Sequence, residues 1–202
     1  MTDADGAFGA LTPLKYGAIL ADPPWQTVLR SAQGYGRAPE AHYATMTPEA
    51  LRALPVDRLA GPDCYLFLWA CWPHLPAALE LMRAWGFAYV TGGAWTKRTK
   101  TWKVAMGTGY VLRSASEPFL VGRIGAPRIA SRGERNAILA PGDVPDSIEA
   151  IRREHSRKPP QMREMIDRLL PHQTFCELFA REAWPGHDVW GDQADTFSEA
   201  QR

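Results

Sequence analysis

The sequence has few cysteines, no long apolar run and almost no net charge. Its 202 residues contain three cysteines, Cys64, Cys71 and Cys176, with no C-x-x-C pair and no histidine at a zinc-ligand spacing. We therefore expect buried free thiols and no metal site. The longest apolar stretches, such as residues 64–71, are too short to cross a bilayer, and the N-terminus lacks the basic and apolar regions of a secretory signal. These absences predict a cytoplasmic protein without a membrane anchor.

The net charge of +1 hides an uneven distribution of charge along the chain. Between Lys97 and Arg135, nine cations stand against two carboxylates, so this segment carries +7 and the remainder carries −6. A cationic segment on an acidic body can attract phosphates locally while the whole protein stays nearly neutral. The alternative interpretation is a solvated loop with no nucleic-acid partner.

Short apolar runs alternate with helical patterns and predict one α/β domain over residues 16–195, with a tail or a loosely docked arm at 1–15 and a tail at 196–202. Thr47 can cap a helix that begins at Pro48, and Gly86 suits a helix end. The segment 26–46 is a long loop of the kind that is often functional, and 147–153 fits either a strand or a helix. We expect strands at 16–21, 64–70, 87–95, 119–122 and 174–179, and further helices at 73–85 and 161–170. This alternation predicts a mostly parallel sheet with helices on both faces.

The four residues Asp22, Pro23, Pro24 and Trp25 follow the first predicted strand directly. Ligands of open α/β sheets bind beyond the carboxyl ends of the strands. An exocyclic amine on an aromatic base is a poor nucleophile unless acceptors draw on its hydrogens, and the Asp22 carboxylate and a carbonyl of the stiff Pro-Pro unit are such acceptors. Trp25 offers a flat face for an extruded base. The alternative is a polar turn whose tryptophan packs into the core.

Eight ordered blocks of the chain resemble the MT-A70-like adenine N6-methyltransferase family, which includes the catalytic subunit of the eukaryotic messenger-RNA writer and bacterial and phage DNA-modifying members. The likeness runs from about residue 18 to residue 193. The blocks are A-D-P-P-W at 21–25, H-Y-A-T-M at 42–46, Y-L-F-L-W at 65–69, W-T-K at 95–97, G-T-G-Y-V-L-R-S-A-S-E at 107–117, H-S-R-K-P at 155–159, E-L-F-A-R at 177–181 and V-W-G-D-Q at 189–193.

The resemblance implies a Rossmann-like methyltransferase fold in a permuted order, with the catalytic block before the cofactor block, and S-adenosylmethionine as the methyl donor. It places the target adenine and the transferable methyl at Asp22, Pro23, Pro24 and Trp25. The implied cofactor-binding residues are Asp22, Pro24, Lys158, Phe179, Arg181, Asp192 and Gln193. The resemblance also implies Tyr43, Arg113 and Glu117 as substrate-binding residues. To these the basic segment adds the cations Lys97, Arg98, Lys100 and Lys103.

The chain also departs from the family pattern. No acidic pair near the N-terminus matches the one that binds the cofactor adenine in relatives, and Ala183-Trp184 replaces a His-Asn pair of the eukaryotic enzyme. Asp192 replaces an asparagine, which keeps an acceptor and removes donors. An arginine at position 113 resembles the bacterial members, which favours DNA as the substrate. RNA, a catalytically silent nucleic-acid-binding subunit and a small-molecule or protein substrate remain alternatives, and a homodimer is left open.

Overall fold

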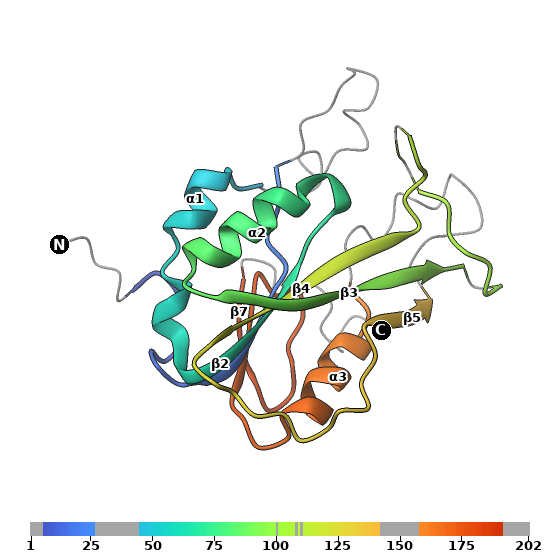
Figure 1. Cartoon of the computed structure of the whole chain (residues 1–202). Helices are drawn as coiled ribbons and strands as arrows, with labels where there is room; N and C mark the ends of the chain where they lie inside the picture. Colours follow the sequence, from blue (N-terminus) through green and yellow to red (C-terminus); the bar gives the residue numbers. More distant parts are fainter. Residues whose placement is uncertain are drawn as a thin grey trace.

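One sheet of seven strands forms the centre of the computed structural model of the chain, in the residues that it describes: 6–26, 45–99, 101–107, 109, 111–141 and 158–191 (Figure 1). The strands lie side by side in the order β5-β3-β4-β2-β1-β6-β7. Their bounds are β1 (Tyr16–Ala21), β2 (Ala60–Trp69), β3 (Ala88–Arg98), β4 (Ser116–Ile124), β5 (Ala137–Pro141), β6 (Phe175–Leu178) and β7 (Asp188–Trp190). The helices are α1 (Pro48–Ala53), α2 (Leu75–Ala84) and α3 (Gln161–Leu169), with 3-10 turns η4 (Val56–Leu59) and η5 (Trp72–His74).

The strand directions bring several strand ends to one edge of the sheet. β1 pairs in parallel with β2 and β6, and β6 in parallel with β7. β4 runs antiparallel to both β2 and β3, so β3 runs in the direction of β1. The carboxyl ends of β1, β2, β3 and β6 therefore meet the amino end of β4 at a single edge. With β3 and β5 also parallel, the predicted mostly parallel α/β sheet is confirmed.

Alternating side chains of the strands divide the core between the two faces of the sheet. Ile19, Leu66 and Leu68 point to the face that packs against α1 and α2. Ala18, Leu20 and the strand residues beside them point to the opposite face, where α3 buries Met162, Met165 and Ile166. Figure 1 shows α1 and α2 on one side of the sheet and α3 on the other. The helices cover both faces, as the alternation of strands and helices predicts.

The predicted starts of α1 and α3 are correct, and other predicted bounds need adjustment. The Thr47 hydroxyl accepts a hydrogen bond from the Ala50 N–H at 3.2 Å, and Pro48 begins α1. The helix expected over 73–85 divides into η5 and α2, and Gly86 follows with φ +80°, a conformation that glycine adopts without strain. β2, β3 and β4 extend beyond the predicted strands, whereas β5 and β7 were not predicted. The ambiguous segment 147–153 lies outside the described residues.

One further expectation changes in the structure, and the structure chooses between two alternatives for the N-terminal segment. Cys64 and Cys176 are buried, but Cys71 is exposed because it lies beyond the end of β2, so the expectation of a buried thiol there is wrong. Of the tail and the docked arm, the described part of the N-terminal segment is a docked arm: Phe8 is 6% exposed and meets the Trp190 ring edge-on, with 5.1 Å between the ring centroids. Among the described residues, no helix is long and apolar enough to span a membrane.

Candidate active site

Asp22 is the first residue beyond β1, at the edge where the strand ends meet. The following turn is tight, because the Trp25 N–H donates to the Pro23 carbonyl at 2.8 Å. The Pro24 carbonyl accepts the Met46 N–H at 3.0 Å, which ties the turn to the segment that enters α1. Each carbonyl retains a second lone pair. The Asp-Pro-Pro unit is thus a rigid support that presents a carboxylate at the end of a central strand.

Four side chains of alternating charge form a continuous chain at this edge. Lys158 Nζ lies 2.9 Å from Asp22 Oδ2 and 3.3 Å from Glu117 Oε2. Lys97 Nζ donates to Glu117 Oε1 at 2.6 Å. All four side chains are largely shielded from solvent, with exposed fractions between 18% and 25%. The sequence predicted each of these residues for the site, and the structure joins them through direct contacts.

Burial and mutual attraction shift the pKa values within this chain of charges. Burial raises the pKa of the Asp22 carboxyl, and the neighbouring Lys158 opposes that rise. Burial would also raise the pKa of Glu117, but Lys158 and Lys97 together hold it at about 2. For Lys158, burial lowers the pKa, but Asp22 and Glu117 more than compensate and raise it. Lys158 and Glu117 therefore stay charged at neutral pH, and Asp22 is the more basic of the two carboxylates, Asp22 and Glu117.

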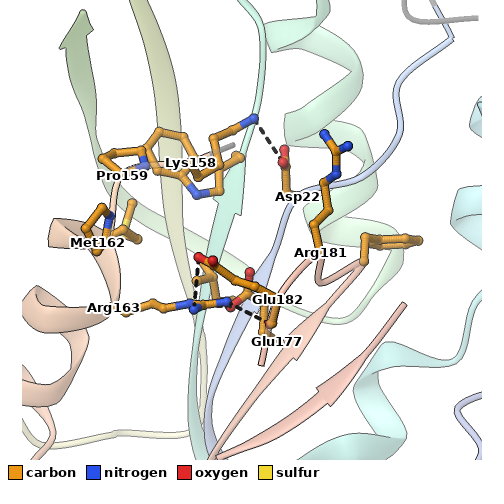
Figure 2. Close-up of a pocket in the computed structure, with 12 residues that line it drawn as sticks. Asp22, Lys158, Pro159, Met162, Arg163, Glu177, Arg181 and Glu182 are labelled. Atoms are coloured by element: carbon orange, nitrogen blue, oxygen red, sulfur yellow. Dashed lines mark hydrogen bonds and ion pairs between the residues drawn. The ribbon is translucent and has the colours of Figure 1, made fainter. Parts of the chain in front are cut away.

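A pocket opens beside Asp22 on the face of the sheet that α3 covers (Figure 2). Its charged wall consists of Asp22, Lys158, Arg163, Glu177, Arg181 and Glu182, and its apolar wall includes Leu20, Trp69, Met162 and Phe179. Phe179 directly follows β6 and adopts φ +61°, a strained conformation for a bulky residue. That turn carries the chain from the end of β6 to Arg181 at the pocket wall.

The side chain of Arg163 extends from α3 along the pocket to residues at the end of β6. Its guanidinium approaches Glu177 Oε2 at 2.7 Å and Glu182 Oε1 at 3.4 Å. It also donates to the backbone carbonyls of Glu182 and Ala183, both at 3.2 Å, and lies over the Trp184 ring. Burial raises the pKa of Glu177 to about 7, although Arg163 opposes the rise. Arg163 therefore links α3 to the segment that carries Arg181 (Figure 2).

Sequence reasoning did not assign Arg163, Glu177 or Trp69 to the site. A signal for Glu177 was available, because it is the one charged residue among apolar neighbours in the strand 175–178. The indole N–H of Trp69, a residue 1% exposed at the end of β2, donates to no partner within the part of the chain that the structure describes. A buried donor without a partner at a pocket wall indicates space for a polar ligand atom.

The pocket suits S-adenosylmethionine in its chemistry. The ligand carries a carboxylate, an amine, a ribose diol and a sulfonium, and the pocket offers cations at Lys158 and Arg181, acceptors at Asp22 and Glu177, and apolar surfaces. Of the predicted cofactor residues, Asp22, Lys158, Phe179 and Arg181 meet here, and Pro24 lies in the adjoining turn. Asp192 and Gln193 lie outside the described residues.

Trp25 does not offer the open face that the sequence predicted. Its side chain is 8% exposed, stacks on His74 with 5.8 Å between ring centroids, and donates from Nε1 to the Trp69 carbonyl at 3.3 Å. The alternative interpretation, a tryptophan packed into the core, describes this arrangement. Trp25 thus packs beneath the core side of the turn that carries Asp22 and stabilises it. A base that enters the site needs another aromatic surface for stacking.

The predicted substrate cations fall into two groups. Lys97 lies inside the site, bound to Glu117. Arg98 is the last residue of β3, and Lys103 and Arg113 belong to the connection between β3 and β4. Lys103 and Arg113 are exposed, and Arg98 donates to the Trp102 carbonyl at 3.1 Å. Both ends of this connection emerge from the site edge, next to Lys97 and Glu117. Tyr43 and Lys100 lie outside the described residues.

Comparison with known proteins finds one matching family model, MT-A70, over residues 16–193. The chain is 30% identical to the Type II methyltransferase M.MunI of a Mycoplasma species over 206 aligned residues, which cover 93% of this chain and 81% of the relative. It is 27% identical to the human N(6)-adenine-specific methyltransferase METTL4 over 90% of this chain. It is 30% identical to the human N(6)-adenosine-methyltransferase catalytic subunit METTL3, also over 90% of this chain. The aligned part spans 38% of METTL4 and 28% of METTL3.

Proposed function

The chain belongs to the MT-A70 family, and from this membership and the geometry of the site we propose that it transfers a methyl group from S-adenosylmethionine to the N6 amine of adenine in DNA. The observation that carries the proposal is the Asp22 carboxylate, largely shielded from solvent at the end of the central strand β1 and bound to Lys158 beside a pocket with matching polar groups.

Asp22 performs the central task in this proposal. Its carboxylate accepts a hydrogen bond from the adenine amine, and the free lone pair of the Pro23 carbonyl accepts a second one. Both acceptors draw electron density onto the nitrogen, and shielding from water strengthens the effect. Bound S-adenosylmethionine supplies a methyl group on a positively charged sulfur. Since the amine must lose one proton during methylation, the raised pKa of Asp22 favours this carboxylate as the proton acceptor.

Lys158 and Glu117 hold Asp22 in place. Lys158 fixes the orientation of the Asp22 carboxylate at 2.9 Å and lends the site a cation for the cofactor carboxylate. Glu117 and Lys97 keep the group of four close to neutral, with two positive and two negative charges, so that a neutral base can enter without a large desolvation cost. The enzyme thus accelerates methyl transfer by positioning the reactants and by preorganised charge, and no covalent enzyme intermediate is needed.

One observation supports DNA over RNA as the substrate. The bacterial Type II methyltransferase aligns with this chain over most of both proteins, whereas the adenosine methyltransferase METTL3 aligns over 28% of its own length. The exposed Lys103 and Arg113 stand on the connection that leaves the site edge, where they can contact the phosphates of either nucleic acid close to a target base. An RNA adenine methyltransferase is the second candidate, because acceptors aimed at N6 do not distinguish the sugar.

The proposal is tested by separating cofactor binding from methyl transfer. We expect Asp22→Ala to bind S-adenosylhomocysteine within about tenfold of the wild-type affinity in calorimetry, and to transfer no detectable labelled methyl group to a random-sequence DNA pool. Transfer by Asp22→Ala at the wild-type rate would remove Asp22 from the reaction. If the wild-type chain binds no S-adenosylhomocysteine, a catalytically silent subunit becomes the better account.

A further inference from the structure

Glu177 and Arg163 lie in the pocket, and the polarisation of the amine described above uses neither. Glu177 is a side chain only 12% exposed, in a strand whose other residues are buried and apolar. Its partner Arg163, 16% exposed, reaches it from α3 on the opposite side of the pocket. Removal of an ionised carboxylate from water costs free energy. The pairing of Glu177 with an arginine from another element therefore indicates that the ionised form of Glu177 has a role in the pocket.

The register of the sheet places Glu177 deeper in the sheet than Asp22, the partner of Lys158. Leu20 of β1 pairs with Glu177 of β6, and Asp22 lies two residues beyond Leu20 on the same face. Two residues of strand separate the levels of these carboxylates by roughly 7 Å. Lys158 contacts Asp22 and provides the cation for a ligand carboxylate, so the deeper Glu177 faces a different part of the ligand.

We propose that Glu177 is the hydrogen-bond acceptor for the ribose diol of the cofactor, and that Arg163 is a positioning residue that holds it ionised and aimed into the pocket. This inference rests on the proposed function. A diol presents two adjacent O–H donors, and an ionised carboxylate is an acceptor with two oxygens, which makes the two groups complementary. Protonation of Glu177 converts one oxygen into a donor and removes that match.

The arrangement around Arg163 supports a positioning role. Its planar guanidinium is fixed by Glu177, by two backbone carbonyls beyond β6, and by stacking over Trp184 at 5.4 Å. Trp184 in turn stacks on Phe175 of β6, with 5.6 Å between ring centroids. The Trp184 ring thus helps to hold in place the arginine that faces Glu177.

The charges that face Glu177 determine its expected titration. Arg163 of α3 favours the ionised form, while Asp22 at the end of β1 and Glu182 beyond β6 oppose it. Lys158 and Arg181 stand at the same pocket wall. Burial, helped by Asp22 and Glu182, outweighs Arg163 and raises the pKa of Glu177 to about 7. Binding of a diol by the ionised form should therefore strengthen as pH rises from 6 to 8, and loss of Arg163 should move that rise to higher pH.

The test measures binding of S-adenosylhomocysteine and of methylthioadenosine, which has the ribose diol but lacks the amino acid, by calorimetry between pH 6 and pH 9. We expect Glu177→Gln to weaken both ligands roughly 10- to 100-fold at pH 8 and to abolish the pH dependence with methylthioadenosine. Arg163→Met should match that loss at pH 7 and regain affinity toward pH 9, and Arg163→Lys should stay closer to the wild type. Arg168→Met, which removes an exposed arginine of the same helix bonded to Glu134, is the matched control and should behave as the wild type.

The outcomes separate this inference from the proposed function. If Glu177→Gln weakens only S-adenosylhomocysteine, the carboxylate serves the amino-acid end and the diol assignment is wrong. If Arg163→Met lowers affinity equally at every pH, Arg163 is only a structural crosslink. If the wild-type chain binds S-adenosylhomocysteine and both variants bind it equally well, the inference fails and the proposed function stands. If the wild-type chain binds neither ligand, the proposed function itself fails.

Discussion

Replacement of Lys158 by methionine tests whether the chain of four charges is an integrated unit. The substitution keeps the length of the side chain but leaves the carboxylates of Asp22 and Glu117, each less than 20% exposed, without their shared cation. Removal of one partner from a fully buried ion pair costs about 3–5 kcal/mol. Because these side chains keep some contact with solvent, we expect a loss of about 2–3 kcal/mol at pH 8, or about 5–10 °C in Tm for a domain of this size.

The loss should depend on pH in a defined direction. Without Lys158, burial and mutual repulsion raise the pKa values of Asp22 and Glu117 in the folded state above their values in the unfolded chain. The folded variant then binds more protons than the unfolded one, so its stability rises as pH falls. The difference in free energy of unfolding between the wild type and Lys158→Met should therefore shrink between pH 8 and pH 5.

Urea denaturation of the two proteins at pH 5, 6, 7 and 8 measures this difference. Lys15→Met is the matched control, because the Lys15 ion pair with Asp188 has a similar distance, 2.7 Å, but side chains about 40% exposed. An exposed pair is worth less than about 1 kcal/mol. A penalty for Lys158→Met that is no larger than that of the control, or that stays constant from pH 8 to pH 5, would refute the reasoning.

Three further predictions concern the support of the site and its surroundings. Trp25→Ala should destabilise the fold by about 3–5 kcal/mol in urea denaturation, because it empties a buried ring position; a loss below 1 kcal/mol would mean that the ring is not part of the core. Gly93→Ala should lower Tm and loosen β5, since the added Cβ would collide with the backbone carbonyl of Asn136 beside that strand; an unchanged Tm would contradict the tight approach. The double change Lys103→Ala and Arg113→Ala should weaken DNA binding and reduce the salt-dependence slope by about two in fluorescence anisotropy titrations, and an unchanged slope would place the phosphates elsewhere.

The sequence was sufficient for the elements with a strong local pattern. The buried run 16–21 and the prolines after it predict β1 and its end, and the capping residues Thr47 and Pro48 predict the start of α1. β5 and β7 were missed because they are short strands at the two edges of the sheet with no clear period. Their place depends on pairing with distant neighbours, which local pattern does not encode.

Contacts within the site were less accessible to sequence reasoning. Lys158 and Asp22 are 136 positions apart, and their 2.9 Å contact depends on the sheet order and on the way the chain enters α3. Resemblance to a family assigned both residues but did not reveal that they bind each other. For Trp25, the local motif fits either a stacking face or a core residue, and only packing against His74 decides for the core. Arg163 carried no signal of its own, because a cation on an amphipathic helix is ordinarily exposed.

The most direct test of the proposed function is the chemical identity of the product. Wild-type protein is incubated with S-adenosylmethionine and equal amounts of random-sequence DNA and RNA in one reaction, and the nucleosides are quantified by mass spectrometry after digestion. We expect N6-methyl-2′-deoxyadenosine to accumulate in the DNA, to exceed N6-methyladenosine in the RNA, and to be absent with Asp22→Ala. Methylation of another base or another atom of adenine, or the same yield of N6-methyl-2′-deoxyadenosine from Asp22→Ala, would contradict the assignment of Asp22 to the polarisation of the adenine amine.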